Sequence, residues 1–480
     1  MKVSLTTTLS ASLLLSASAI SLHADRHAAE TPPNILFILV DDLGWNSLGS
    51  YGSVFFDTPH LDRLAEQSVR FTDAYSPSPA CTPSRYAILT GKSPARTGIT
   101  HIPFFNRWPT RHELALRSPH IPERVPDHVR TLAHQLQERG YVTGQGGKWH
   151  MYHTQEEFGF DVGFTGHGIH EFPGASTTRR DNNQHIWDRF ENEFPDLAEG
   201  EFLECELVTR AIDFMNDNKD RHWFYYYDPF LVHTPILSRH KWLIDKYRER
   251  FEKQGIELVN PTYAAMVETL DHTVGQLLDE LERLGLRDNT IIIFSSDNGA
   301  VAELHAHPFI VSDNSPLFQG KVTMYEGGIR VPLLVDWPGV TEPGRVTDVP
   351  VDLKDLFPTI LEMVGAEIPS GQVHDGVSWV PLLRGEENFE RGPLYWHYPH
   401  IVNPRPRFPG RDTHFVGVAR QGDWKLILSY EDDSMELFNL RDDIGESNNL
   451  AKTHPERAQQ MKRDLQTWLR DIGANMPRKK

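Results

Sequence analysis

The sequence predicts an α/β protein, with a large, mostly parallel sheet flanked by helices and a smaller C-terminal α+β domain. Short apolar runs alternate with amphipathic stretches of helical period, which is the pattern of parallel strands joined by helices. This alternation ends near residue 385, beyond which short strand-like runs follow one another. At 480 residues the chain exceeds one typical hydrophobic core, so two domains are expected.

The large domain is predicted over residues 30–385. Its strands are short apolar runs that end at polar or turn-forming residues, namely Asn34–Val40, Tyr141–Gln145, Trp223–Tyr227, Thr290–Ser295 and Val331–Asp336. Its helices are stretches with one apolar face, namely Pro59–Val69, Val129–Arg139, Thr262–Leu284 and Leu353–Val364. The clearest is Thr262–Leu284, because Met266, Leu270 and Val274 share a face and Gly285 ends the pattern.

The smaller domain is predicted over residues 386–480 and carries an antiparallel sheet and one helix. Thr413–Ala419 and Asp423–Leu428 form a predicted hairpin around Gln421-Gly422. Glu436–Leu440 is expected to add a strand, and Glu456–Leu469 is expected to form the helix.

The N-terminus predicts an export signal over residues 1–24. Lys2 gives a short positive region, an apolar region with three consecutive leucines follows within residues 9–22, and cleavage is expected after Ala19 or Ala24. No later segment contains about 18 uninterrupted apolar residues, so no membrane span is expected. The formal net charge of −18 argues against nucleic acid and anionic membranes as partners. We therefore expect an exported protein, periplasmic or secreted.

The chain has only two cysteines, Cys81 and Cys205, so at most one disulfide could form. We expect no bridge, because the surroundings of Cys81 indicate another role, and Cys205 fits a helix core position. Pro83 suits the first turn of a helix, which places Cys81 at a helix N-terminus, where free N–H groups and the dipole favour an anion. Arg85, one turn on, can hydrogen-bond a nucleophile or an oxyanion. This arrangement is typical of a nucleophile site for an anionic substrate.

The most polar segments of the large domain follow its predicted strands. These segments are Asp41-Asp42, Gly147–His150, Asp228 to His233, and Asp297-Asn298. In open α/β sheets, ligands bind beyond the carboxyl ends of the strands, so these segments are expected to converge. Their carboxylate and amide oxygens suit calcium or magnesium better than zinc. Lys148 and His150 alternate along an extended segment, so both side chains can reach one pocket.

Cys81-Thr82-Pro83-Ser84-Arg85 resembles the sequence that formylglycine-generating enzymes read in type I sulfatases, which are arylsulfatase-like members of the alkaline phosphatase superfamily. The other motifs of that family follow in the family's order, with no member missing. They are the Asp41-Asp42 pair, Gly147-Lys148-Trp149-His150, Val232-His233-Thr234-Pro235, the Asp297-Asn298 pair and Gly320-Lys321. Gly422–Lys425 resembles the family's smaller domain, so the resemblance covers nearly all of the mature chain.

The resemblance implies that Cys81 is oxidised to formylglycine, whose hydrate attacks a sulfate ester. The expected partner for this oxidation is a formylglycine-generating enzyme or an anaerobic sulfatase-maturating enzyme. Asp41, Asp42, Asp297 and Asn298 would hold one divalent cation that also contacts residue 81. In the family this cation is usually Ca²⁺, and four oxygen ligands also permit Mg²⁺.

The resemblance also implies roles for the basic residues. Lys148, Lys321 and Arg85 would supply positive charge around the sulfate. His233, with Lys321, would protonate the leaving alcohol, and His150 would accept the proton whose loss expels sulfate.

A sulfated oligo- or polysaccharide is the expected substrate, because export and an alcohol that needs acid assistance favour a carbohydrate sulfate. His397, His400, Arg107 and His170 are candidate substrate contacts, and the first two lie in an aromatic segment interpreted as a loop. Two alternatives stay open. One is a phosphonate or phosphodiester hydrolase of the same superfamily, and the other is a catalytically silent protein that binds sulfated glycans.

Overall fold

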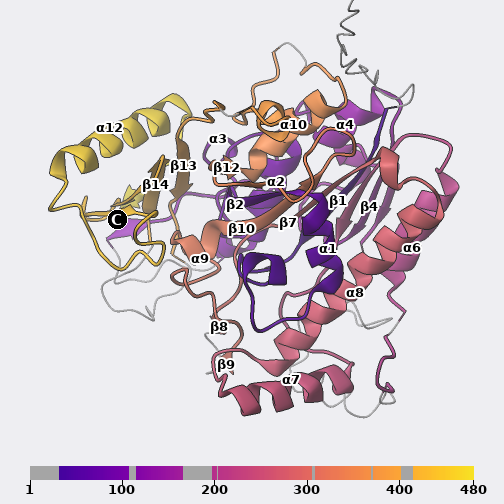
Figure 1. The fold of residues 1–480 in the computed structure, drawn as a ribbon. Coiled ribbons are helices and arrows are strands. Elements are labelled where there is room, and N and C mark those ends of the chain that lie inside the picture. The colour runs from indigo at the N-terminus through magenta and orange to yellow at the C-terminus, as the bar shows by residue number, and fades with distance from the viewer. Residues whose placement is uncertain are drawn as a thin grey trace, which may run out of the picture.

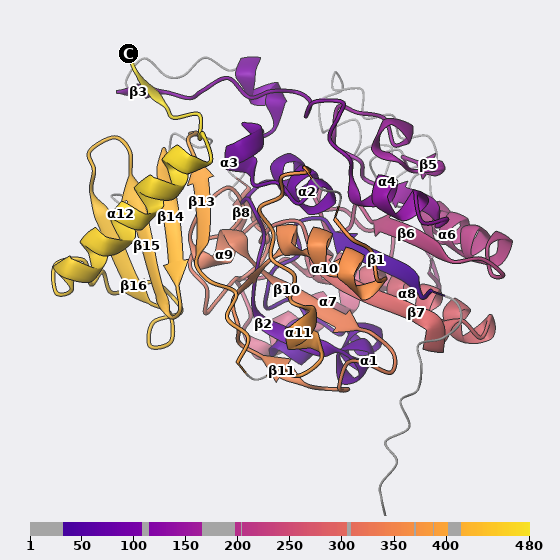
Figure 2. The same ribbon diagram turned by 90° about the horizontal axis from the view of Figure 1, so that it is seen from above.

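The structure is a computed structural model that describes residues 32–107, 115–165, 197–202, 204–304, 309–368, 371–386, 388–401 and 414–480. The predicted export signal and His170 lie outside the described residues. Two sheets organise the described chain, one large and one small, and the small sheet lies at one side of the molecule (Figures 1 and 2). The predicted fold class is confirmed.

The large sheet has the strand order β11-β2-β10-β7-β1-β6-β4-β5, with β12 beside β2. Its strands are β1 (Asn34–Val40), β2 (Val69–Tyr75), β4 (Val142–Gly147), β5 (Val162–Phe164), β6 (Trp223–Asp228), β7 (Thr290–Ser296), β10 (Arg330–Asp336), β11 (Val346–Thr347) and β12 (Val351–Asp352). Among the described strands of this sheet, only β10 runs antiparallel to its neighbours, β2 and β7. The carboxyl ends of β1, β4, β6 and β7 therefore lie along one edge.

Helices cover both faces of this sheet (Figure 1). One face carries α2 (Cys81–Thr90), α4 (Leu132–Gln137) and α10 (Leu356–Met363), and the other carries α1 (Pro59–Gln67), α6 (Glu206–Asp217), α7 (Lys241–Gln254) and α8 (Pro261–Arg283). The described residues also form shorter elements. These are α3 (Pro94–Thr97), α9 (Glu326–Ile329), α11 (Val380–Leu383), the 3-10 turns Gly49–Tyr51, Pro103–Arg107, Glu156–Phe158, Arg287–Asn289 and Leu353–Asp355, and the strand pairs β3 (Leu116–Arg117) with β17 (Arg478–Lys479) and β8 (Glu303–Leu304) with β9 (Phe309–Ile310). Within the described ranges, no helix combines the length and the apolar character needed to cross a membrane.

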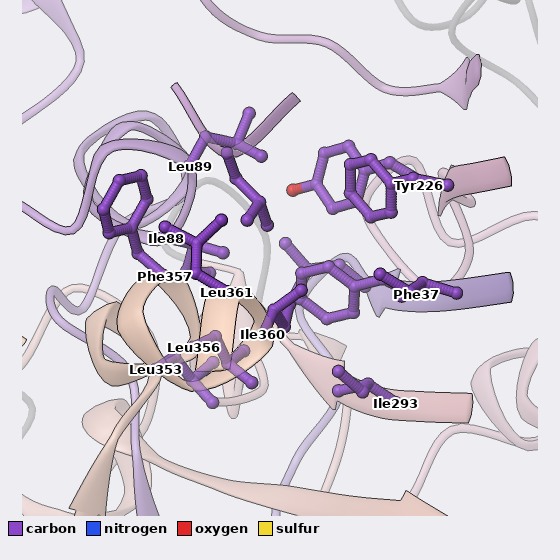
Figure 3. Close-up of a cluster of buried hydrophobic side chains, with 14 of the residues drawn as sticks. Phe37, Ile88, Leu89, Tyr226, Ile293, Leu353, Leu356, Phe357, Ile360 and Leu361 are labelled. Carbon is purple, nitrogen blue, oxygen red and sulfur yellow. The ribbon is translucent and has the colours of Figure 1, made fainter. Parts of the chain in front are cut away.

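Strand β1 shows how the core is built, because all seven of its residues are buried. Successive side chains of a strand point to opposite faces. Phe37 accordingly packs with α2 and α10, in the cluster of Figure 3, and Ile38 packs on the side of α8. Burying each such side chain stabilises the fold by about 1.5–3 kcal/mol. The apolar run is therefore continuous, as in a strand covered on both faces.

The small sheet is antiparallel and has the order β13-β14-β15-β16. Its elements are β13 (Leu394–Tyr398), β14 (Val416–Gln421), β15 (Trp424–Ser429), β16 (Met435–Asn439) and the covering helix α12 (Pro455–Asp471). The predicted hairpin is present, with Gly422 at φ 57° in its turn. The face away from α12 packs against Tyr75 and the α9 segment of the large domain.

Three sequence predictions need correction. The helix predicted over Pro59–Val69 ends at Gln67, because Val69 begins β2, a strand that the sequence analysis missed. The segment around Trp396, interpreted as a loop, forms β13 through Tyr398. Cys205 is the buried N-cap residue of α6 and not an interior helix position. Neither cysteine is in a disulfide, as expected.

A buried ion cluster joins the small sheet to the large domain. Lys425 of β15 lies 2.8 Å from Oε1 of Glu326, in α9, and 2.8 Å from Oε1 of Glu446, which follows β16. All three side chains are fully buried. Because a buried charge without a partner is costly, this cluster fixes how the small sheet packs on the large domain.

Lys425→Ala is expected to lower the free energy of unfolding by about 3–5 kcal/mol, because it leaves Glu446 buried without a cation and Glu326 paired with Arg330 alone. Lys253→Ala, which breaks an exposed pair with Glu249, is the matched control and should change stability by no more than about 1 kcal/mol. Urea unfolding of both variants measures the difference. Equal stabilities would contradict the assignment of this cluster as a structural link.

Candidate active site

The edge where β1, β4, β6 and β7 end gathers the residues that the sequence singled out. Asp41 and Asp42 follow β1, Lys148 and His150 follow β4, His233 lies beyond β6, and Asp297 and Asn298 follow β7. Cys81 begins α2, and Lys321 lies in the loop before α9. The predicted convergence of the segments that follow these strands is present in the structure, and Cys81, Arg85 and Lys321 contact the same group of residues.

Two lysines hold the first pair of carboxylates. The Lys148 ammonium donates to Oδ2 of Asp41, and the Lys321 ammonium donates to Oδ2 of Asp42 at 2.7 Å. Asn298 Nδ2 donates to Oδ1 of Asp42 at 2.8 Å. Asp41 and Asp42 are buried, so each charge is compensated by a cation drawn from another segment of the chain.

The Cys81 thiol lies among these groups. Its sulfur is 3.5 Å from Oδ1 of Asp41, 3.9 Å from Oδ1 of Asp42 and 3.4 Å from Nζ of Lys148. Burial raises the pKa of the Cys81 thiol to about 12, so the thiol is protonated at neutral pH. An unmodified cysteine at this position is therefore a weak nucleophile.

Arg85 is fully buried and uses its guanidinium within the protein. Nε donates to Oδ2 of Asp297 at 2.9 Å, and Nη2 lies 2.8 Å from the same oxygen. Nη1 donates to Oδ1 of Asp228 and to the carbonyl oxygen of Lys148, both at 2.9 Å. The guanidinium thus orients Asp297 and the segment after β4.

The two predicted catalytic histidines are neutral in this arrangement. Burial, with Lys148 and Arg85, holds the pKa of His150 well below its usual range, and Nδ1 of His150 has no partner among the described residues. Burial, with Lys148 and Lys321, lowers the pKa of His233 to about 3. Nδ1 of His233 donates to the carbonyl oxygen of Thr234 at 2.6 Å, which leaves Nε2 facing Asp42 at 3.6 Å. Each ring can therefore accept a proton.

The charged groups of the site shift one another's pKa values, some upward and some downward. Burial alone would raise the pKa of Asp42, but the neighbouring cations, Lys321 foremost, lower it overall. Burial and Asp41 raise the pKa of Asp297. Burial disfavours the charge of Lys148, yet Asp41 raises its pKa overall. A cation placed among these carboxylates would favour their ionised forms.

The residues present fit a divalent cation bound by oxygen. Ligand atoms of Asp41, Asp42, Cys81 and His233 lie within 4.8 Å of one another. Oδ1 of Asn298 is buried and has no hydrogen-bond partner among the described residues, and a cation would satisfy it. Carboxylate and amide oxygens are the ligands that Ca²⁺ and Mg²⁺ prefer.

Two of the predicted substrate contacts, His397 and His400, have ring nitrogens close to polar groups of the protein. His397 lies in β13, where Nδ1 is 2.7 Å from the Tyr430 hydroxyl and Nε2 is 3.2 Å from the carbonyl oxygen of Asn475. His400 is buried with Nε2 2.7 Å from the Thr100 hydroxyl. Packing of the small sheet thus occupies both rings, which the sequence alone could not show. Arg107 ends a 3-10 turn, and the contacts of all these residues with a sugar stay a prediction.

The sequence analysis missed two features of the site. Asp228 was noted only for its position after a strand, but its side chain pairs with Arg85. Gly147 has φ 113°, and a Cβ there would lie 1.8 Å from the carbonyl oxygen of Asp228. Only glycine permits this close approach of two strand ends. The sequence did offer one signal for the role of Asp228, namely a carboxylate at the last position of β6, the strand that pairs with β4.

Comparison with known proteins agrees with this geometry. Residues 33–366 match the family model described as Sulfatase, and residues 317–474 match the one described as N-sulphoglucosamine sulphohydrolase, C-terminal. The chain is 34% identical over 398 residues to N-acetylgalactosamine-6-sulfatase of Canis lupus familiaris, covering 80% of this chain and 72% of that protein. It is 31% identical over 511 residues to a protein named Sulfatase from Formosa agariphila, covering 92% of this chain and 89% of that protein.

A solved structure of Ps i-CgsB in complex with k-i-k-neocarrahexaose is similar, with a TM-score of 0.70, 28% identity and coverage of 92% of this chain and 93% of that one. The fold and site thus define a hydrolase of the alkaline phosphatase superfamily. Within it, the chain belongs to the sulfatase family, and the predicted sulfuric ester hydrolase is confirmed.

Buried neutral histidines make the fold sensitive to acid. Burial, with Lys321, lowers the pKa of His101 from 6.5 to about 3. Between these values only the unfolded chain binds a proton at His101, so stability falls as the pH drops below 6.5. The free energy of unfolding should therefore decrease between about pH 7 and about pH 5 by about 2 kcal/mol less in His101→Gln than in the wild type.

Urea unfolding at both pH values measures this change in pH dependence, whatever the effect of the substitution at pH 7. His128→Gln, at an exposed position, is the control and should leave the pH dependence unchanged. An unaltered pH dependence in His101→Gln would show that this ring is not held neutral.

Proposed function

We propose that this sulfatase hydrolyses a sulfate monoester of a sulfated carbohydrate through a formylglycine formed from Cys81. The observation that carries the proposal is the position of Cys81, at the N-terminus of α2 and within 3.5 Å of both an Asp41 oxygen and the Lys148 ammonium. The proposed partner is a formylglycine-generating or anaerobic sulfatase-maturating enzyme.

Unmodified Cys81 would be a poor nucleophile at neutral pH, because burial raises the pKa of its thiol to about 12. A hydrated aldehyde at position 81 would supply one hydroxyl to attack sulfur and a second hydroxyl whose deprotonation releases sulfate. A serine has no second hydroxyl and would stay esterified.

Asp41, Asp42, Asp297 and Asn298 are proposed to hold the divalent cation, with Ca²⁺ favoured and Mg²⁺ permitted. Such an ion would polarise the sulfate and favour an ionised nucleophile. Its positive charge would also compensate part of the negative charge of Asp41 and Asp42, which the ammonium groups of Lys148 and Lys321 contact in this structure. The lysines would then be available to an anionic substrate.

The proposed proton transfers use the two histidines. His150 is neutral at physiological pH and has an unoccupied Nδ1, so it can accept the proton that is lost when sulfate leaves. His233 must be protonated before it can donate to the leaving alcohol. The negative charge of a bound sulfate ester would raise the pKa of His233, and Lys321 provides a second protonated group beside the same carboxylate.

The carbohydrate substrate rests on the similar proteins. N-acetylgalactosamine-6-sulfatase is named for a sulfated sugar, and Ps i-CgsB was solved in complex with k-i-k-neocarrahexaose. Export to the periplasm or medium, proposed from residues 1–24, would bring the enzyme to such polymers.

Cys81→Ala and Cys81→Ser should each lower sulfate release by about 10³-fold or more, because alanine cannot be oxidised to an aldehyde and an unoxidised serine has no second hydroxyl. Sulfate release from N-acetylgalactosamine 6-sulfate and from a carrageenan oligosaccharide measures the loss. Cys205→Ser is the matched control, since it changes the other cysteine, and should keep the activity. Thermal unfolding checks that each variant is folded.

Full turnover by a Cys81→Ser variant whose serine is shown by peptide mass to be unoxidised would contradict the proposal. Faster hydrolysis of phosphonate monoesters or phosphodiesters than of sulfate esters would support the superfamily alternative instead. Binding of a sulfated glycan without any sulfate release, by protein expressed with a maturation enzyme, would identify a silent glycan-binding protein.

A further inference from the structure

We propose that Asp228 is a positioning residue for sulfate ester hydrolysis, which keeps Arg85 from neutralising Asp297 and so preserves the affinity of the site for its divalent cation. The inference rests on the proposed function, because it concerns the same cation site. Among the described contacts, Asp228 touches neither Cys81 nor the Asp41-Asp42 pair, so it acts only through its neighbours.

The side chain of Asp228 is fully buried at the last position of β6. Its Oδ1 accepts a hydrogen bond from Nη1 of Arg85 at 2.9 Å, and its Oδ2 lies 3.4 Å from Nε2 of Gln145, in β4. The carboxylate is therefore held from two directions. It fixes the end of the Arg85 guanidinium that points away from Asp297.

The backbone of Asp228 acts on the same neighbourhood. Its carbonyl oxygen accepts the N–H of Lys148 at 2.7 Å, and Gly147 allows the two chains to approach this closely. Nη1 of Arg85 also donates to the carbonyl oxygen of Lys148 at 2.9 Å. Asp228 thus contacts Arg85 through its side chain and, through its main chain, Lys148, whose ammonium lies 3.4 Å from the Cys81 sulfur.

Charge balance explains why a carboxylate is needed here: burial raises the pKa of Asp228 well above its usual range, and the ion pair with Arg85 at 2.9 Å opposes that rise and favours the ionised form. Arg85 lies between Asp228 and Asp297, and all three side chains are completely buried. Without the charge of Asp228, the guanidinium would have Asp297 as its single counter-ion among the described residues and would attract it more strongly. The guanidinium and a metal ion compete for the negative charge of the same carboxylate, so a tighter pair with arginine weakens cation binding. The net charge of the site would also become more positive, which again opposes cation binding.

Asp228→Asn tests the inference, because it keeps the shape of the side chain and removes its charge. Isothermal titration of the full-length, matured enzyme with Ca²⁺ should show about tenfold weaker binding, equivalent to about 1.4 kcal/mol. The kcat for an aryl sulfate should fall by about tenfold, with KM changed by less than about threefold, since Asp228 does not face the substrate.

Asp355→Asn is the matched control, because Asp355 forms a buried pair with Arg391 outside the site, at 2.6 Å. This variant should lose stability but bind Ca²⁺ as the wild type does. Asp228→Glu keeps the charge and should recover most of the affinity. If Asp228→Asn does not fold, Asp228→Ser, whose smaller side chain leaves room for water, takes its place with the same expected loss.

Wild-type calcium affinity in Asp228→Asn or Asp228→Ser would overturn the inference while leaving the proposed function intact. An equal loss of affinity in Asp355→Asn would also overturn it, because the effect would then be one of general stability. A wild-type enzyme that neither binds Ca²⁺ nor releases sulfate would contradict the proposed function itself.

Discussion

The burial of three carboxylates at one sheet edge is the constraint on which the rest of this structure depends. Asp41, Asp42 and Asp297 are at most 1% exposed and lie at the ends of adjacent parallel strands. Charges removed from water must be compensated, and the chain does so with Lys148, Lys321 and Arg85. Because these cations come from distant segments, the same ion pairs fix the positions of α2, the end of β4 and the loop before α9.

This concentration of charge also explains the local backbone. Asp42 and His150 have φ values of 62° and 53°, in the left-handed region that costs non-glycine residues roughly 1–2 kcal/mol. Such strain persists only where the surrounding packing enforces it, and it is common at functional sites. At this backbone conformation the Asp42 carboxylate meets Cys81, Asn298 and Lys321. The strained backbone thus lowers the stability of the fold, while anions, cations and a buried thiol are already held together before any substrate binds.

The residues that follow the parallel strands were predictable from the sequence, because the ends of such strands meet at one edge and because the motif at Cys81 is specific. Contacts between segments were not. Strand β2 was missed because it begins directly after a helix, and β13 because its aromatic residues resembled a binding loop. The burial of His397 depends on Tyr430 and Asn475, which no local pattern connects to it. The pairing of Asp228 with Arg85 likewise joins positions that only the tertiary fold brings together.

The central claim is that Cys81 gives this site its nucleophile, and the mass of the tryptic peptide Phe71–Arg85 tests it most directly. The peptide should be prepared from enzyme that has been shown to release sulfate. Oxidation of the thiol to an aldehyde predicts a mass about 18 Da below that of the unmodified peptide. An intact thiol in a preparation with full activity would contradict the account, because the enzyme would then release sulfate without the aldehyde hydrate that is proposed as its nucleophile.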